Sequence, residues 1–157
     1  MKLQVQPNAW SCFPTAFAII ADVPIQQVFK TLGTDGSNIV FPELPAPINR
    51  RGFGVNEVIG FMVAMHWSVT PLGLAYEQCS RDYPNSMYTY RLSMPFIRGL
   101  MDEYDGVITG HLPSGYGHAV AWNHEERLAY NPRGSVEDLI SSTLEMDIFY
   151  LCSRLTK

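Results

Sequence analysis

Apolar residues recur every three or four positions in three segments of the first half of the chain, which is the spacing of an amphipathic helix. The first segment begins at Cys12 and has Pro14 near its start, where the missing backbone N–H of proline costs little. The second begins at Pro24 and is stopped by Gly33. The sequence therefore predicts helices over residues 12–22, 24–32 and 55–65.

The second half of the chain changes to short apolar runs bounded by glycine, proline and asparagine, a pattern that predicts strands. The expected strands cover residues 67–72, 106–112, 118–123, 127–131 and 146–154, with 88–91 as a further candidate. One more short helix is expected over residues 95–104, opened by Ser93 or Met94. Helices first and strands afterwards indicate an α+β domain, in which N-terminal helices pack on a C-terminal antiparallel sheet.

A long irregular segment lies between the second and third predicted helices. Residues 33–54 hold glycine or proline at seven positions, so we expect neither a helix nor a strand there. Loops of this length in a compact domain commonly carry function. No linker or repeat divides the chain, and 157 residues is the size of one ordinary domain, so we expect a single domain over residues 1–157.

Composition narrows the classes of function. Hydrophobic residues make up 46% of the chain, as in a globular protein, and charged residues only 17%. The net charge of −4 comes without any cluster of basic residues, which argues against a nucleic-acid partner. The longest apolar stretch, residues 16–21, is too short to cross a bilayer, and no secretory signal is recognisable. We therefore expect no membrane partner and a cytoplasmic location.

The cysteines and histidines favour neither a disulfide framework nor a metal site. The cysteines are odd in number and widely spaced: Cys12, Cys79 and Cys152. Three of the histidines stand at intervals that fit no zinc pattern: His111, His118 and His124. We expect free thiols in a reducing compartment, no metal and no cofactor, with Cys152 as a core residue inside an apolar strand.

Four residues have the chemistry of a thiol acyl-transfer site. Cys12 opens the first predicted helix, where unpaired N–H groups and the helix dipole favour an anion, so we expect a stabilised thiolate. Gln6 stands six residues earlier, with amide donors for an oxyanion. His118 begins one predicted strand and Asn131 ends the next, so pairing of these strands would place the imidazole and the amide at the same end of the sheet. Together these are a nucleophile, a base, an orienting amide and an oxyanion donor.

The order of these motifs resembles that of papain-like cysteine peptidases, and within them the bacteriocin-processing (double-glycine leader) peptidase domains and their standalone relatives. The resemblance covers residues 4–133 and rests on four segments: Gln6 to Ala16 with its Cys12-Phe-Pro motif, the glycine loop and helix start at 51–58, Gly117-His118 before an apolar strand, and Asn131-Pro132. It implies a papain-like fold and a peptide or protein substrate. It further implies that Cys12 is the nucleophile and His118 the base. Asn131 would orient the ring, and Gln6 would help to hold the oxyanion.

Three positions depart from the pattern of these relatives, which usually carry Asp before the cysteine, Gly after it, and Asp in the place of Asn131. Here Ser11 precedes Cys12 and the bulky Phe13 follows it, where it could crowd the oxyanion hole. Asn131 would stabilise an imidazolium less than a carboxylate does. Two alternatives therefore stay open: a catalytically inactive fold that binds a peptide or protein, and acyl transfer to an amine instead of water.

Overall fold

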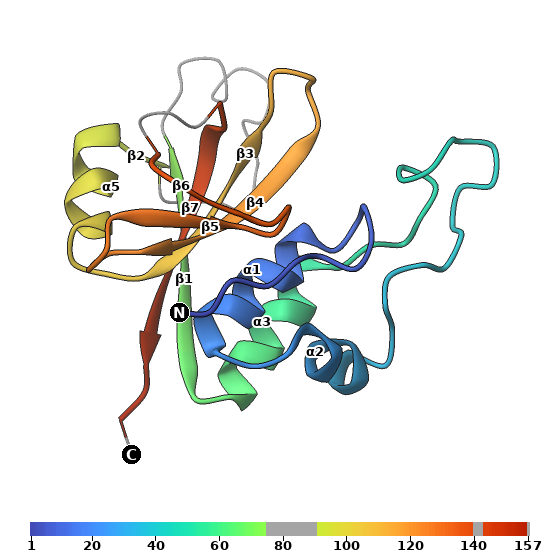
Figure 1. The fold of residues 1–157 in the computed structure, drawn as a ribbon, viewed down its shortest axis with the longest axis horizontal. Helices are drawn as coiled ribbons and strands as arrows, with labels where there is room; N and C mark the ends of the chain where they lie inside the picture. The colour runs from blue at the N-terminus through green and yellow to red at the C-terminus, as the bar shows by residue number, and fades with distance from the viewer. Residues whose placement is uncertain (75–90, 140–142, 157) are drawn as a thin grey trace.

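The computed structural model describes residues 1–74, 91–139 and 143–156, and within them helices cover both faces of a twisted sheet (Figure 1). Two helices pack on one face, α1 (Cys12–Ala21) and α3 (Val55–Ala64), and α2 (Ile25–Leu32) packs against both of them. The helix α5 (Met94–Met101) lies against the other face, next to β1 and β7. The expected α+β class, with helices on an antiparallel sheet, is confirmed at this level.

The sheet has seven strands in the described part of the chain. They are β1 (Trp67–Leu74), β2 (Arg91–Leu92), β3 (Gly106–His111), β4 (Gly117–Asn123), β5 (Leu128–Asn131), β6 (Ser135–Glu137) and β7 (Glu145–Arg154). Their order across the sheet is β2-β1-β7-β3-β4-β5-β6. All neighbours pair antiparallel except β1 and β2, which are parallel. The last strand, β7, is thus inserted between β1 and β3.

Successive side chains of the central strands point to opposite faces of the sheet, and this divides the core into two layers. On β4, Ala119 and Ala121 belong to the cluster that contains the buried face of α1. Their neighbours Val120 and Trp122 belong to a second cluster, which includes Ile97 of α5. Because both faces of the sheet are covered, the central strands are apolar at almost every position, as in a strand buried on both sides.

The helices and long strands lie where the sequence predicts them, within one or two residues, except that α5 ends at Met101, three residues before the predicted end; Ser93 is its N-cap. The strand β6 was not predicted, because its three residues are partly or fully exposed and carry no apolar pattern. Part of the candidate strand at 88–91 lies outside the described residues, and Arg91 belongs to β2. Residues 33–54 contain no helix or strand beyond an isolated bridge between Ile39 and Arg50, and they extend away from the rest of the chain (Figure 1).

The segment before α1 is anchored by the side chain of Gln4. Its Oε1 accepts a hydrogen bond from the Ile25 N–H at 2.9 Å, and its Nε2 donates to the Val23 carbonyl at 2.7 Å. The first of these bonds caps α2, because it gives a partner to the Ile25 N–H, which has none within the helix. They also fix the chain on its way to Gln6 and Cys12.

The helix α1 is almost entirely buried from Pro14 to Ile20. It ends at Asp22, whose left-handed backbone lets the next N–H reach the Ala18 carbonyl at 3.1 Å. In the described ranges no single helix is long and apolar enough to span a bilayer; α1 and α2 reach that length only as a pair, across a bend of 113°.

Gly110 is required by the close approach of β7 to β3. A Cβ at this position would lie 1.8 Å from the Glu145 carbonyl oxygen, at a bulge where Gly110 also pairs with His118 of β4. We expect Gly110→Ala to lower the free energy of unfolding by at least about 3 kcal/mol, because the two backbones must separate.

The matched control is Gly60→Ala in α3, where a Cβ meets nothing within 4 Å. Replacing a glycine inside a helix by alanine should raise stability by roughly 0.5–1 kcal/mol. Urea unfolding of the two variants measures the difference. Equal stabilities would contradict the assigned register between β3 and β7.

Candidate active site

His118 and Asn131 meet through a direct side-chain contact. The strands β4 and β5 pair antiparallel, with Ala121 opposite Tyr130, which brings the start of β4 near the end of β5. His118 Nε2 lies 2.8 Å from Asn131 Oδ1, and the two residues are only 5% and 9% exposed. The structure thus brings together the imidazole and the amide that the sequence singled out.

The hydrogen bonds around Asn131 determine which ring nitrogen of His118 carries the proton. Asn131 Nδ2 donates to a carboxylate oxygen of Glu137 at 2.8 Å, and Asn131 Oδ1 accepts the Arg133 backbone N–H at 2.9 Å. An ionised carboxylate can only accept and a backbone N–H can only donate, so the amide has one possible orientation. Its oxygen faces the ring, and therefore Nε2 is the protonated nitrogen of the neutral imidazole. The lone pair, and with it the basicity, is on Nδ1.

Cys12 lies at the amino end of α1, half-buried beside β4. The Ala119 backbone N–H acts on its thiol, together with the N–H groups of Phe13 and of Cys12 itself. Ala119 directly follows His118, so the sulfur lies next to the strand residue adjoining the imidazole. Among the described residues, no hydrogen bond joins the thiol to the ring in this resting arrangement.

Burial decides the charge state of both reactive groups. It raises the pKa of the Cys12 thiol above the ordinary value, although three backbone N–H groups and the charge of Arg133 act in the opposite direction. Burial also lowers the pKa of His118, assisted by Arg133 and opposed by the bond to Asn131 and the charge of Glu137. The expected stabilised thiolate is therefore wrong: desolvation outweighs the helix terminus, and near neutral pH both groups are uncharged.

Gln6 is tied to the same end of the sheet by its backbone. Its N–H donates to the Pro132 carbonyl at 2.7 Å, and Pro132 directly follows Asn131. Its side-chain Nε2 donates to the Asn8 carbonyl at 2.8 Å. An amide nitrogen carries two hydrogens, so one donor of Gln6 is left after this bond.

The ring of Phe13 packs inside the protein. It makes edge-to-face contacts with Phe17 at 5.0 Å and with Tyr150 of β7 at 5.4 Å between ring centroids. These contacts fill the space between α1 and the sheet. The expectation that this side chain crowds the oxyanion hole is not supported, because its partners are core residues.

The other cysteines and histidines do not join this cluster in the described residues. Cys152 is buried in β7, and burial raises the pKa of its thiol to about 12. Cys79 lies outside the described residues. His111 pairs with Asp147 and His124 pairs with Asp105, and neither pair includes His118. Over residues 1–74, 91–139 and 143–156, no three histidine, cysteine, aspartate or glutamate side chains gather in a way that could hold a metal ion.

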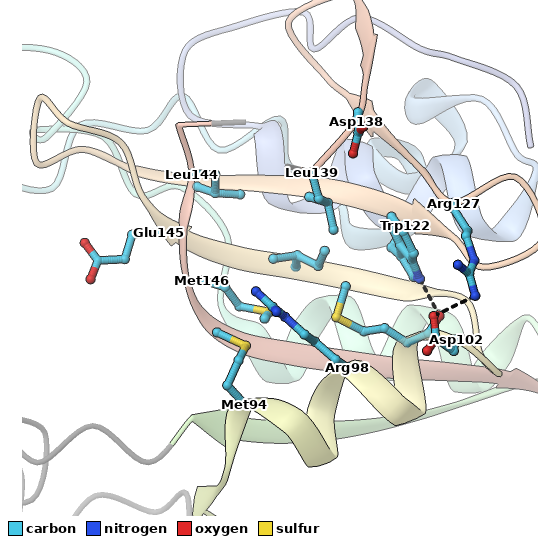
Figure 2. Close-up of a pocket in the computed structure, with 12 residues that line it drawn as sticks. Met94, Arg98, Asp102, Trp122, Arg127, Asp138, Leu139, Leu144, Glu145 and Met146 are labelled. Atoms are coloured by element: carbon cyan, nitrogen blue, oxygen red, sulfur yellow. Dashed lines mark hydrogen bonds and ion pairs between the residues drawn. The ribbon is translucent and has the colours of Figure 1, made fainter. Parts of the chain in front are cut away.

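A separate cavity of about 500 Å³ lies on the face of the sheet covered by α5 (Figure 2). Met94, Met101 and Trp122 contribute to its apolar lining, and Arg127 pairs with Asp102 beside it at 3.3 Å. The described residues that line it include no cysteine, histidine or serine. This cavity therefore contains no thiol or hydroxyl nucleophile, and Cys12 lies on the opposite face of the sheet.

Sequence reasoning missed Arg133 and Glu137. The charges of both residues act on His118, and both residues come shortly after Pro132, which follows β5. The sequence offers one signal for these residues, which is the glycine at position 134. Gly134 adopts a φ of 103° in the turn between β5 and β6. A turn there predicts a hairpin and would have placed residues 135–137 beside β5.

The low pKa of His118 makes stability depend on pH in a defined direction. The folded protein holds the ring neutral below the ordinary pKa of 6.5, whereas the unfolded chain does not. Below that pH the unfolded chain binds more protons, so the free energy of unfolding falls as the pH falls toward the folded-state value. We expect His118→Gln to lose less stability between pH 7 and pH 5 than the unsubstituted protein.

Thermal unfolding at a series of pH values measures this difference. The control is His66→Asn, which removes an exposed histidine and keeps a residue that tolerates its φ of 62°. If His118→Gln and His66→Asn change the pH dependence equally, the ring is not held neutral by burial.

No protein-family model matches the chain, and no curated protein is detectably similar to it in sequence. The function therefore has to be judged from the site itself. This site combines a thiol at a helix start with backbone N–H groups around it, and an imidazole with a fixed tautomer at the start of the neighbouring strand.

Proposed function

We propose that the chain is a thiol hydrolase of papain-like fold that cleaves a peptide, isopeptide or other amide bond. The observation that carries this proposal is the fixed tautomer of His118. Asn131 holds the Nε2–H, and the basic Nδ1 has no hydrogen-bond partner in the described part of the chain. A base with this arrangement suits nucleophilic catalysis, since it lies at the start of β4 next to Ala119, whose backbone N–H acts on the Cys12 thiol.

In the acylation step, Nδ1 of His118 accepts the thiol proton as the sulfur attacks the substrate carbonyl carbon. The C–S bond forms and the carbonyl π electrons move onto oxygen. The resulting imidazolium then gives its Nδ1 proton to the amine, and the C–N bond breaks. The Nε2–H stays with Asn131 throughout, so the ring keeps its orientation while the proton moves.

In the deacylation step, Nδ1 accepts a proton from water while the water oxygen attacks the thioester carbonyl. The C–S bond breaks, and the proton returns to the sulfur. The products are a carboxylic acid and the free thiol. An amine in place of water would give a new amide by the same route.

In this mechanism two donors hold the oxyanion of each tetrahedral intermediate. One is the Cys12 backbone N–H, at the helix start where N–H groups lack intrahelical partners. The other is the remaining hydrogen of Gln6 Nε2. Donors already oriented toward the developing charge act with little reorganisation, which is why such sites accelerate acyl transfer.

Because the resting thiol and imidazole are both neutral, proton transfer has to accompany the attack. The reaction then needs an unprotonated His118, whose pKa is below its ordinary value. We expect the rate to rise with pH along a limb centred below 6.5, and not to require prior ionisation of Cys12.

Acetylation by p-nitrophenyl acetate tests the nucleophile and base without knowledge of the substrate. We expect a burst of nitrophenolate and one acetyl group on Cys12, located by mass spectrometry. Cys12→Ala should abolish the burst, and His118→Gln should slow it by about 10²–10⁴, the usual contribution of a general base. The control Cys79→Ser should leave the burst unchanged.

Amide cleavage is then tested on a mixed pool of peptides, with Cys12→Ala as the matched inactive protein. Products that gain one water support hydrolysis, and ligated products support transfer to an amine. The non-catalytic alternative predicts that the unsubstituted protein and Cys12→Ala bind peptides equally and that neither is acetylated or cleaves. That result would remove the hydrolase proposal.

A further inference from the structure

We propose that Glu137 is a positioning residue of this site, which acts on His118 through the side chain of Asn131. The inference rests on the proposed function, and it extends the site by a carboxylate that the sequence pattern did not indicate. The three side chains form a continuous chain of contacts: His118 Nε2 to Asn131 Oδ1 at 2.8 Å, and Asn131 Nδ2 to Glu137 Oε1 at 2.8 Å.

The β5–β6 hairpin places Glu137 for this contact. Asn131 pairs with Ser135 and Ala129 pairs with Glu137, so Asn131 and Glu137 are diagonal neighbours on the same face of the two strands. The tight turn between them is closed by the Gly134 N–H, which donates to the Asn131 carbonyl at 2.8 Å. The Ser135 hydroxyl donates to the same oxygen of Glu137 that accepts from Asn131. The carboxylate is thus held from two sides.

The orientation of the Asn131 amide has two independent supports. The Arg133 backbone N–H donates a hydrogen bond, so Asn131 Oδ1 must face it. The Glu137 carboxylate accepts one, so Asn131 Nδ2 must face the carboxylate. The negative charge, however, comes from Glu137 alone among the described groups bonded to this amide. A hydrogen bond from the amide to a carboxylate polarises the amide, which makes its oxygen a stronger acceptor for the ring N–H.

This arrangement compensates for the neutral residue at position 131. An asparagine directly beside the ring stabilises an imidazolium less than an aspartate would. In this protein the carboxylate of Glu137 is bonded to the Asn131 amide, on the side away from the ring. The charged groups that act on His118 are Glu137, which favours the imidazolium, and Arg133, which disfavours it. Glu137 therefore offsets part of the effect of burial and of the nearby cation, and the pKa of His118 stays below its ordinary value.

The decisive variant is Glu137→Gln, because a glutamine oxygen can still accept from Asn131 but carries no charge. NMR of protein labelled with ¹⁵N in its histidine rings reports the tautomer and the pKa of His118, which is assigned with His118→Gln. We expect Glu137→Gln to keep the Nε2–H tautomer and to lower the pKa of His118. Acetylation by p-nitrophenyl acetate should slow by about fivefold, the difference between a hydrogen bond to a charged and to a neutral acceptor.

Two comparisons separate this role from a general effect. Glu125→Gln removes the same charge from an exposed turn and should change neither the pKa of His118 nor the rate. In an Asn131→Ala background, Glu137→Gln should lower the pKa of His118 by less than it does alone, because only the through-space effect of the carboxylate charge is then left to remove.

The proposal is overturned if Glu137→Gln leaves the pKa of His118 unchanged, or lowers it equally in the Asn131→Ala background. The NMR result does not depend on catalysis. A protein that shows the expected pKa changes without any acetylation of Cys12 would keep the positioning role of Glu137 and remove the hydrolase proposal. If acetylation depends on Cys12 and His118 but neither its rate nor the pKa of His118 changes in Glu137→Gln, the hydrolase proposal stands and the positioning role of Glu137 is removed.

Discussion

The packing of α1 against β4 is the constraint on which the site depends. Seven consecutive residues of α1 are buried, and the small side chains of Ala119 and Ala121 let the helix approach the strand closely. A helix held along such a length cannot shift without exposing a large apolar area. Its first residue, Cys12, is therefore fixed beside the strand residue that follows His118. The Cys12 thiol is placed by the hydrophobic burial of its helix.

The same burial sets the chemistry of the resting site. A thiolate and an imidazolium are both disfavoured where water is excluded, so the structure holds the uncharged pair. In the proposed mechanism, the helix terminus and the nearby N–H groups, which favour an anion, act when negative charge develops on the substrate oxygen. The proposal therefore assigns these donors to the transition state more than to the resting thiol.

The orientation of the His118 ring is set by a short network of hydrogen bonds around Asn131. Asn131 uses its oxygen for the ring and for the Arg133 N–H, and its nitrogen for Glu137. Buried polar groups are costly when unpaired, so a side chain with every group bonded has little freedom to reorient. The fixed amide selects one tautomer of the imidazole, and this selection gives a neutral histidine a defined basic nitrogen.

The sequence by itself determined the helices, most strands, the irregular segment at 33–54, and the juxtaposition of His118 with Asn131. These follow from local periodicity, from turn residues and from the pairing of adjacent strands. Tertiary structure alone decided three features: the insertion of β7 between β1 and β3, the inward packing of Phe13, and the charge state of Cys12. Each depends on residues distant in the chain, such as Tyr150 against Phe13. Local pattern carries no information on such contacts, and desolvation of a thiol is known only when its surroundings are complete.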